Sequence, residues 1–345
     1  MKPTPSDITF GDDLHIHDIA LHPKSDVAGA CLVDGSVHLF AYDNDGAQRI
    51  LFSSRHHSDA CRSIVFTFCG NGLYSASKDQ SIAVLDLNAQ VVVHQGKNAH
   101  SSPINVLGTY EHNLLISGDD EGDVSLWDVR TNWRQPSISW TQHENADYIS
   151  DFCAVPEQFH VLATSADGTL GVWDIRGKGS LEAMSDCVED ELLSVCVIKG
   201  GKKVICGSQD GVLVVFSYGD FGDYDDRYPG HPQSIESLIA IDQDTVCTAS
   251  SDGLIRIVQI QPNKLLGVIG QYDFPVERIR LSHDKQWIAS CAHDGAVKFW
   301  EAGYLFEVDD EDDDAEADEN SDTPMTDRPN GLHPPSGSSF FAGLD

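Results

Sequence analysis

Basic residues are scarce in this sequence of 345 residues. It has 22 Lys and Arg against 55 Asp and Glu, which gives a formal net charge of −33 at pH 7. A surface that binds nucleic acid needs clustered Lys and Arg to displace counterions from the phosphates, and the sequence contains no such cluster. Extensive direct contact with RNA or DNA is therefore not expected. The acidity instead favours basic protein partners.

Paired cysteines and long apolar runs are also lacking. The nine cysteines are scattered without a C-x-x-C pair, as in a nuclear or cytosolic protein whose thiols stay reduced. No Cys or His group has the spacing of a metal site, the first residues lack the apolar run of a signal peptide, and no segment is long enough to span a membrane. We expect no metal and no membrane partner.

Motifs of enzymes are missing as well. No Gly-rich phosphate loop follows a strand, and no nucleophile elbow occurs. The pairs His15/His17 and His56/His57 are more typical of loop caps than of metal ligands. The sequence therefore predicts a protein without catalytic residues and without a cofactor.

A repeated cassette is what the sequence does contain. It is clearest at 162–176, where an Asp-Gly turn precedes an apolar strand that ends in Trp-Asp-Ile-Arg. Seven copies recur at steps of 42 to 46 residues, the length of one four-stranded propeller blade. Their acidic turn residues are Asp34, Asp79, Glu121, Asp167, Asp210, Asp252 and Asp294.

This period predicts an all-β fold, a seven-bladed β-propeller over residues 1–307. Residues 7–10 form a short candidate strand before the first full blade, and we expect it to pair with the last blade and close the ring. Residues 308–345 change composition: nine of the eleven residues from 309 to 319 are acidic, which predicts a disordered tail. The tail ends in Phe340, Phe341 and Leu344, a candidate short recognition motif.

Histidine, hydroxyl and acidic residues recur at matching offsets in the repeats. They invite a catalytic interpretation, but an active site would normally occur once, so we favour a buried hydrogen-bond network that fixes each blade. Three repeats lack a member, with Ala163, Cys206 and Gln271 at the expected positions. The network residues are His57, Ser75, Asp79, His100, Ser117, Glu121, Trp127, Asp167, Trp173, His231, Thr248, Asp252, Asp294 and Trp300.

Two matched Trp-Asp-x-Arg boxes stand apart from this framework. Strand alternation places Arg130 and Arg176, with Asp128 and Asp174, on the face opposite the Asp-Gly turns, in neighbouring blades three and four. The boxes are similar to those of WD-repeat substrate receptors of cullin-RING ubiquitin ligases, where the Arg contacts the adaptor. The Arg could equally be a common repeat ending. Residues 218–231, rich in aromatic and acidic residues, are either an outer edge strand or a partner-binding loop.

Several segments between the blades are more specific than the Trp-Asp dipeptides: Ser117–Gly122, Asp147–Asp151, Glu189–Val195, Lys203–Ser208 and Pro262–Lys264, together with the terminal Phe340-Phe341 and Leu344. In these segments the sequence resembles the WD repeat-containing protein 55 family and its fungal counterparts. The resemblance implies a nucleolar scaffold in ribosome biogenesis, acting in the maturation of ribosomal RNA for the large subunit. A monomer that works within larger complexes of pre-ribosomal or basic ribosomal proteins is the expectation, and the ligase receptor is the alternative.

Overall fold

A computed structural model describes residues 5–11, 14–42, 49–111, 113–130, 135–141, 147–177 and 179–307. The predicted tail and its Phe340, Phe341 and Leu344 lie outside the described residues. Within them, the structure is almost entirely β-strand, with two short 3-10 helices, η1 (Pro156–Gln158) and η2 (Gly303–Phe306). In this part of the chain, no helix is long and apolar enough to cross a membrane.

Seven four-stranded sheets form the seven blades, as the repeat predicts. The first three blades are β2 (Ile16–Leu21), β3 (Val27–Leu32), β4 (Ser36–Ala41), β5 (Arg49–Arg55); β6 (Cys61–Phe66), β7 (Gly72–Ser77), β8 (Ile82–Asp86), β9 (Val91–Gly96); and β10 (Ile104–Tyr110), β11 (Leu114–Asp119), β12 (Asp123–Asp128), β13 (Ile138–Thr141). The next three are β14 (Ile149–Val155), β15 (His160–Ser165), β16 (Leu170–Asp174), β17 (Ser180–Met184); β18 (Leu192–Ile198), β19 (Lys203–Ser208), β20 (Val212–Ser217), β21 (Asp226–Pro229); and β22 (Ile235–Ala240), β23 (Thr245–Ser250), β24 (Leu254–Gln259), β25 (Lys264–Gln271). The seventh blade is β26 (Val276–Leu281), β27 (Trp287–Ala292), β28 (Ala296–Glu301) and β1 (Ile8–Thr9).

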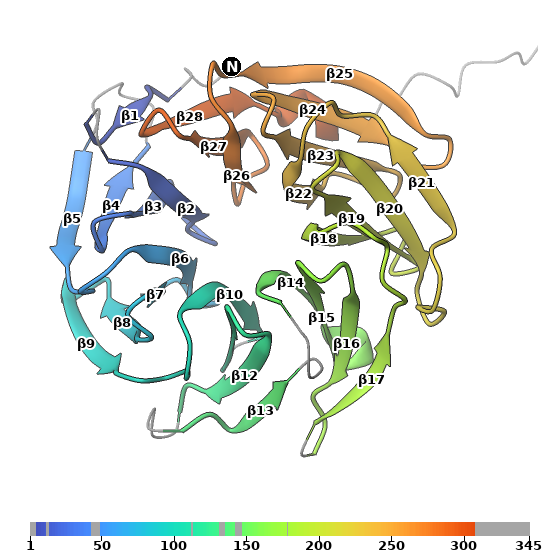
Figure 1. Cartoon of the computed structure of the whole chain (residues 1–345). Helices are drawn as coiled ribbons and strands as arrows, with labels where there is room; N and C mark the ends of the chain where they lie inside the picture. Colours follow the sequence, from blue (N-terminus) through green and yellow to red (C-terminus); the bar gives the residue numbers. More distant parts are fainter. Residues whose placement is uncertain are drawn as a thin grey trace, which may run out of the picture. The chain divides into compact units, whose positions relative to one another are not determined.

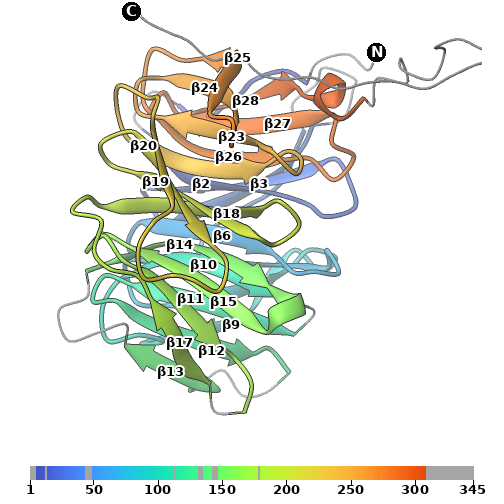
Figure 2. The same cartoon turned by 90° about the vertical axis from the view of Figure 1, so that its right-hand side faces the viewer.

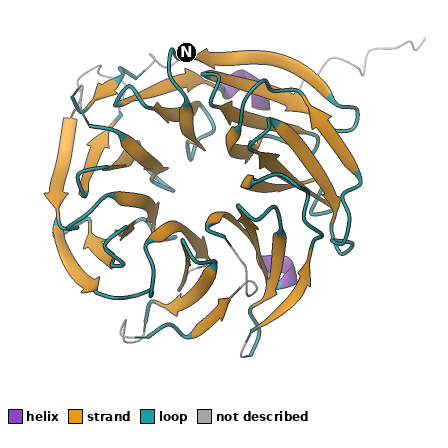
Figure 3. Ribbon diagram, viewed as in Figure 1, coloured by secondary structure: helices purple, strands orange, loops and turns teal. Residues whose placement is uncertain are grey.

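The first six sheets are antiparallel meanders whose first strand lies near the centre of the ring and whose last strand lies at its rim (Figure 1). In the seventh sheet β26 is the inner strand and β1 the outer one. Loops join the strands at both ends of every blade (Figure 3). In the view turned by 90°, the inner strands of successive blades, such as β10, β14 and β18, lie one above another (Figure 2). Residues 218–231 contain β21, which pairs with β20 as an outer edge strand.

The ring closes between the two ends of the propeller sequence. Strand β1 pairs antiparallel with β28, with Ile8 opposite Val297 and Thr9 opposite Ala296, which is the pairing that the sequence predicts for residues 7–10. Ile8 is buried in a cluster that joins blades seven and one. Two residues that lie far from blade seven in sequence thus complete its four-stranded sheet and cover the edge of β28.

The tight turns between the second and third strands explain the recurring acidic residue. In five blades the turn Asp accepts a hydrogen bond from the backbone N–H two residues on, at 2.8–3.0 Å, and the donors belong to Ser36, Ser81, Thr169, Leu254 and Ala296. Six turns place Gly after the acidic residue, at φ between 67° and 84°. At Gly35 a Cβ would lie 2.6 Å from the carbonyl oxygen of Asp59, so the turn requires glycine there.

Candidate functional site

The hydrogen-bond network is complete in blade two. His57 Nε2 lies 2.9 Å from Ser75 Oγ, and His57 Nδ1 lies 2.9 Å from Ser81 Oγ and 3.5 Å from Asp79 Oδ1. Burial is the largest effect and disfavours the charged imidazolium, but the hydrogen bonds and charges of Asp79 and Cys61 together outweigh it and raise the pKa of His57 to about 9. The side chain is fully buried, so the network holds strands together and offers no access to a substrate.

Blade three contains the same network with a different acid. His100 Nε2 lies 2.6 Å from Ser117 Oγ, which also accepts the indole N–H of Trp127 at 2.8 Å. The carboxylate that meets His100 Nδ1, at 2.9 Å, belongs to Asp119. The assignment of Glu121 to this role is wrong: Glu121 is exposed at the tip of the turn, two residues beyond the end of the buried strand. Asp119 is fully buried beside the imidazole of His100, which is where the network needs its acid.

Blade six divides the network into two parts. His231 Nε2 lies 2.8 Å from Thr248 Oγ1, as predicted. Asp252 does not complete it, because its Oδ1 accepts a hydrogen bond from Arg256 Nη1 at 3.0 Å. Burial, followed by the neighbouring Arg256 cation, lowers the pKa of His231 to about 4. The ring of His231 therefore stays neutral at pH 7.

Blades seven and four show what replaces a missing member. In blade seven Tyr272, not Gln271, takes the place of the loop His: its hydroxyl lies 2.7 Å from Ser290 Oγ, which also accepts the indole N–H of Trp300 at 2.6 Å. In blade four Ala163 offers no acceptor. The buried indole N–H of Trp173 consequently has no hydrogen-bond partner among the described residues.

The centre of the ring contains buried charges. Asp18, on the inner strand of blade one, accepts hydrogen bonds from Ser63 Oγ and the backbone N–H of Ile64 in blade two, at 2.9 and 3.1 Å. Its other oxygen lies 3.1 Å from Arg280 Nη2 in blade seven. The carboxylate of Asp18 in blade one therefore links blade seven to blade two. It is fully partnered, so we assign it to the architecture.

The paired boxes lie on the surface. Arg130 Nε and Nη2 contact Asp128 at 2.9 and 2.6 Å, and the guanidinium of Arg176 makes the same fork onto Asp174. The two arginine side chains are 66% and 61% exposed. The arginine bonds lower the pKa of each aspartate to about 2, so both pairs remain ionised. The two guanidinium groups are therefore held in the same conformation on neighbouring blades, and each keeps N–H groups that can donate to a partner.

Comparison with known proteins adds the family. The model of the WDR55 family matches residues 5–305, the whole propeller. The chain belongs to the WDR55 family. It is 38% identical to WD repeat-containing protein 55 of Rattus norvegicus over 307 residues, which cover 88% of this chain and 78% of the rat protein. It is 37% identical to the Arabidopsis thaliana protein of that name, over 84% and 81% of the two chains, and 38% identical to WD repeat-containing protein JIP5 of Coprinopsis cinerea, over 87% and 75%.

A WDR55-family propeller fits protein–protein interaction, because its rigid ring carries surface sites on two faces and a rim. Sequence reasoning missed three residues of the hydrogen-bond networks in this chain: Asp119, Arg256 and Tyr272. A search that let the acidic residue lie two positions before its repeat offset would have found Asp119 in place of Glu121. A search that let the loop residue lie one position later would have found Tyr272 in place of Gln271. The Arg256–Asp252 pair was visible as an i, i+4 spacing within one hairpin.

Proposed function

We propose that this chain is a non-enzymatic scaffold in ribosome biogenesis that binds assembly factors or basic ribosomal proteins in the nucleolus during maturation of large-subunit RNA. The match to the WDR55 family over the whole propeller carries the proposal. A scaffold needs a rigid body with several surfaces, and seven closed blades supply one.

The face that carries the Asp-Gly turns supports a basic partner. A hollow of about 570 Å³ there is lined by residues of blades five to seven, among them Asp210, Glu236 and Glu277. Burial, and then the neighbouring Glu236, raises the pKa of Glu277, which pairs with His293. A lysine or arginine that entered this hollow would relieve the repulsion between the two carboxylates.

Rapid depletion of the protein in its own organism tests the proposal. We expect precursors of large-subunit RNA to accumulate and large subunits to fall relative to small subunits, as seen by pulse labelling and sucrose gradients. Re-expression of the full chain should restore both. Unchanged precursor ratios after complete depletion would contradict the proposal.

The paired boxes favour a second function, that of a substrate receptor in a cullin-RING ubiquitin ligase. Arg130 and Arg176 have the exposure and the matched posture that adaptor binding would use. Affinity purification separates the two functions, because a scaffold retrieves pre-ribosomal factors and a receptor retrieves a cullin adaptor. Arg130→Ala combined with Arg176→Ala should abolish retrieval of an adaptor and leave the melting temperature within a few degrees. Retention of the adaptor by this variant would exclude the boxes as its site.

A further inference from the structure

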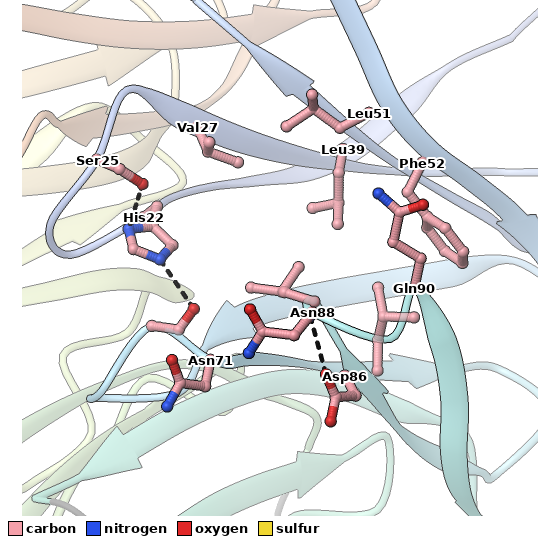
Figure 4. Close-up of a pocket in the computed structure, with 13 residues that line it drawn as sticks. His22, Ser25, Val27, Leu39, Leu51, Phe52, Asn71, Asp86, Asn88 and Gln90 are labelled. Carbon is pink, nitrogen blue, oxygen red and sulfur yellow. Dashed lines mark hydrogen bonds between the residues drawn. The ribbon is translucent and has the colours of Figure 1, made fainter.

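A pocket of about 280 Å³ lies between blades one and two, apart from the hollow and the paired boxes (Figure 4). Its apolar wall comes from both blades and includes Leu39, Leu51 and Phe52 from blade one and Leu85 and Leu87 from blade two. Polar side chains stand around this wall. They are His22, Ser25, Asn71, Asp86, Asn88 and Gln90.

The turn at Asp86, which lines this pocket, can be compared with the matching turns of blades three and four. Asp86 in blade two is the structural equivalent of Asp128 and Asp174: each ends the third strand of its blade. In each, Oδ1 accepts the backbone N–H of the residue two positions on, at 2.9, 3.0 and 2.8 Å. The backbone N–H of the residue directly after each aspartate also makes the same kind of bond, to the carbonyls of Asn71, Asn113 and Phe159. The three turns therefore occupy the same place in their blades and make the same backbone hydrogen bonds.

The repeats differ in the side chain that occupies the turn. Blades three and four place an arginine two residues after the aspartate, and its guanidinium forks onto the carboxylate. Blade two has Asn88 at that position, and Asn88 uses only its backbone N–H on Asp86. Asp86 Oδ1 also takes the N–H of Ala89, while Oδ2 has no hydrogen bond or ion pair with any described residue. Blade two thus keeps the carboxylate and lacks the cation.

The surroundings of Asp86 suit a guest side chain. The side-chain amides of Asn71, Asn88 and Gln90 line the pocket and make no hydrogen bond within the described part of the chain. In blade four, Arg176 lies over the ring of Phe159, 5.4 Å from its centre, so a guanidinium on this turn also packs against its neighbours. Asn71 occupies the corresponding place in blade two, where its amide oxygen is an acceptor for guanidinium N–H groups.

We propose that this pocket binds an arginine of a partner protein, which forks onto Asp86 as Arg176 does onto Asp174, with a nearby apolar side chain of the same segment on the wall of Leu51, Phe52 and Leu87. Charge complementarity favours this occupant, because the carboxylate is unpaired and the chain carries a net charge of −33. The inference does not depend on a role in ribosome biogenesis, since it concerns the chemistry of one site.

A matched pair of probes tests the proposal on the full chain. N-acetyl-Leu-Gly-Arg-amide and its citrulline analogue have nearly the same shape and differ in charge. Titration of isotope-labelled protein, followed by NMR, should shift the side-chain amide signals of Asn71, Asn88 and Gln90 with the arginine peptide. The citrulline peptide should bind about tenfold more weakly, the difference that one charge-assisted pair makes.

Two variants locate the effect. Asp86→Asn keeps an oxygen for the turn hydrogen bonds and should remove the preference for arginine over citrulline. Asn88→Arg recreates the box of blades three and four, so its own guanidinium should occupy Asp86 and abolish binding. Ser101→Arg adds the same charge near the Asp79-Gln80 turn of blade two, where the carbonyl of Ser101 accepts a hydrogen bond from the Gln80 side chain, and should bind as the unmodified chain does.

Three results would overturn the proposal. The first is an absence of shifts at these amides at millimolar peptide. The second is equal affinity for the two peptides. The third is a change in the same signals with protein concentration in the absence of peptide, which would make a second copy of the chain the occupant.

Discussion

At the scale of single residues, the serine of blade three is the point where two buried aromatic side chains find a hydrogen-bond partner. Ser117 Oγ bonds both to the imidazole of His100 and to the indole of Trp127, and the Ser117 side chain has no exposure. Replacing it with Ala removes the hydroxyl but leaves both partners buried, which costs more than the loss of a solvated hydrogen bond.

We predict that Ser117→Ala lowers the free energy of unfolding by about 1–3 kcal/mol, measured by urea denaturation. Blade four supplies the reverse experiment. Ala163 stands ten residues before Trp173, as Ser117 stands ten before Trp127, and Ala163→Ser would give the unpartnered indole N–H an acceptor. We expect that variant to be as stable as the unmodified chain or more stable. Equal losses in both variants would mean that packing, not hydrogen bonding, decides stability here.

Protonation of His57 links stability to pH. Its pKa in the folded protein is about 9, above the ordinary value of 6.5. A raised pKa stabilises the fold fully below about pH 6.5, and this contribution is lost as the pH rises through 9. The free-energy gap between the unmodified chain and His57→Gln should therefore shrink from pH 6.5 to pH 9. Denaturation at several pH values checks this, with the exposed His15→Gln as control. A gap that does not change with pH would contradict the assignment.

The residues also show where reasoning from sequence stops. Repetition was enough to find His57, Ser75 and Asp79, because each stands at the offset that the repeat requires. Repetition fails at Glu121, because the repeat offset points to the turn residue although the acid that contacts the His100 ring is Asp119, at the end of the strand. Strand alternation predicts that Arg130 and Arg176 share one face of the ring, whereas their exposure and their fork onto their own aspartates depend on side-chain geometry, which a sequence pattern does not contain.

At the scale of strands and turns, the recurring acidic turns predicted seven blades, and the seven sheets confirm them. One turn departs from the pattern: Gln80 takes the glycine position with φ of 65°, and its side chain donates to the carbonyl of Ser101 at 3.0 Å. A side-chain hydrogen bond thus accompanies a conformation that glycine adopts more readily. Such substitutions blur a repeat in sequence while the fold keeps it.

The closing strand gives a prediction with a built-in control. Ile8 is 2% exposed and packs in the core between blades seven and one, while its neighbour Thr9 on the same two-residue strand is exposed. Ile8→Ala should lower the free energy of unfolding by about 2 kcal/mol or more, because it leaves a cavity at the closure. Thr9→Ala should change it by no more than about 0.5 kcal/mol. Thermal and urea unfolding of the two variants measure this, and equal effects would show that β1 does not close the ring.

At the scale of the whole molecule, charge is distributed over two parts of the chain. Residues 308–345 contain twelve acidic side chains and one basic one, so they account for −11 of the net −33, and residues 1–307 keep −22. The propeller is therefore strongly acidic without its tail. Long-range attraction of a basic partner should depend on both parts, and short-range selection on sites such as the hollow lined by Asp210 and Glu236.

We predict that the chain cut after Glu307 still binds polylysine, but is released at lower salt than the full chain. Titration from about 50 to 300 mM NaCl covers the range in which screening between exposed charges becomes strong. Asp210→Asn with Glu236→Gln in the shortened chain should lower the salt needed for release once more, if the hollow is a point of contact. A matched pair of neutralised acids elsewhere, Asp226→Asn and Glu182→Gln on the outer strands β21 and β17, separates a local effect from a loss of charge alone. Equal effects of the two pairs would assign the attraction to net charge, and complete loss of binding in the shortened chain would assign it to the tail.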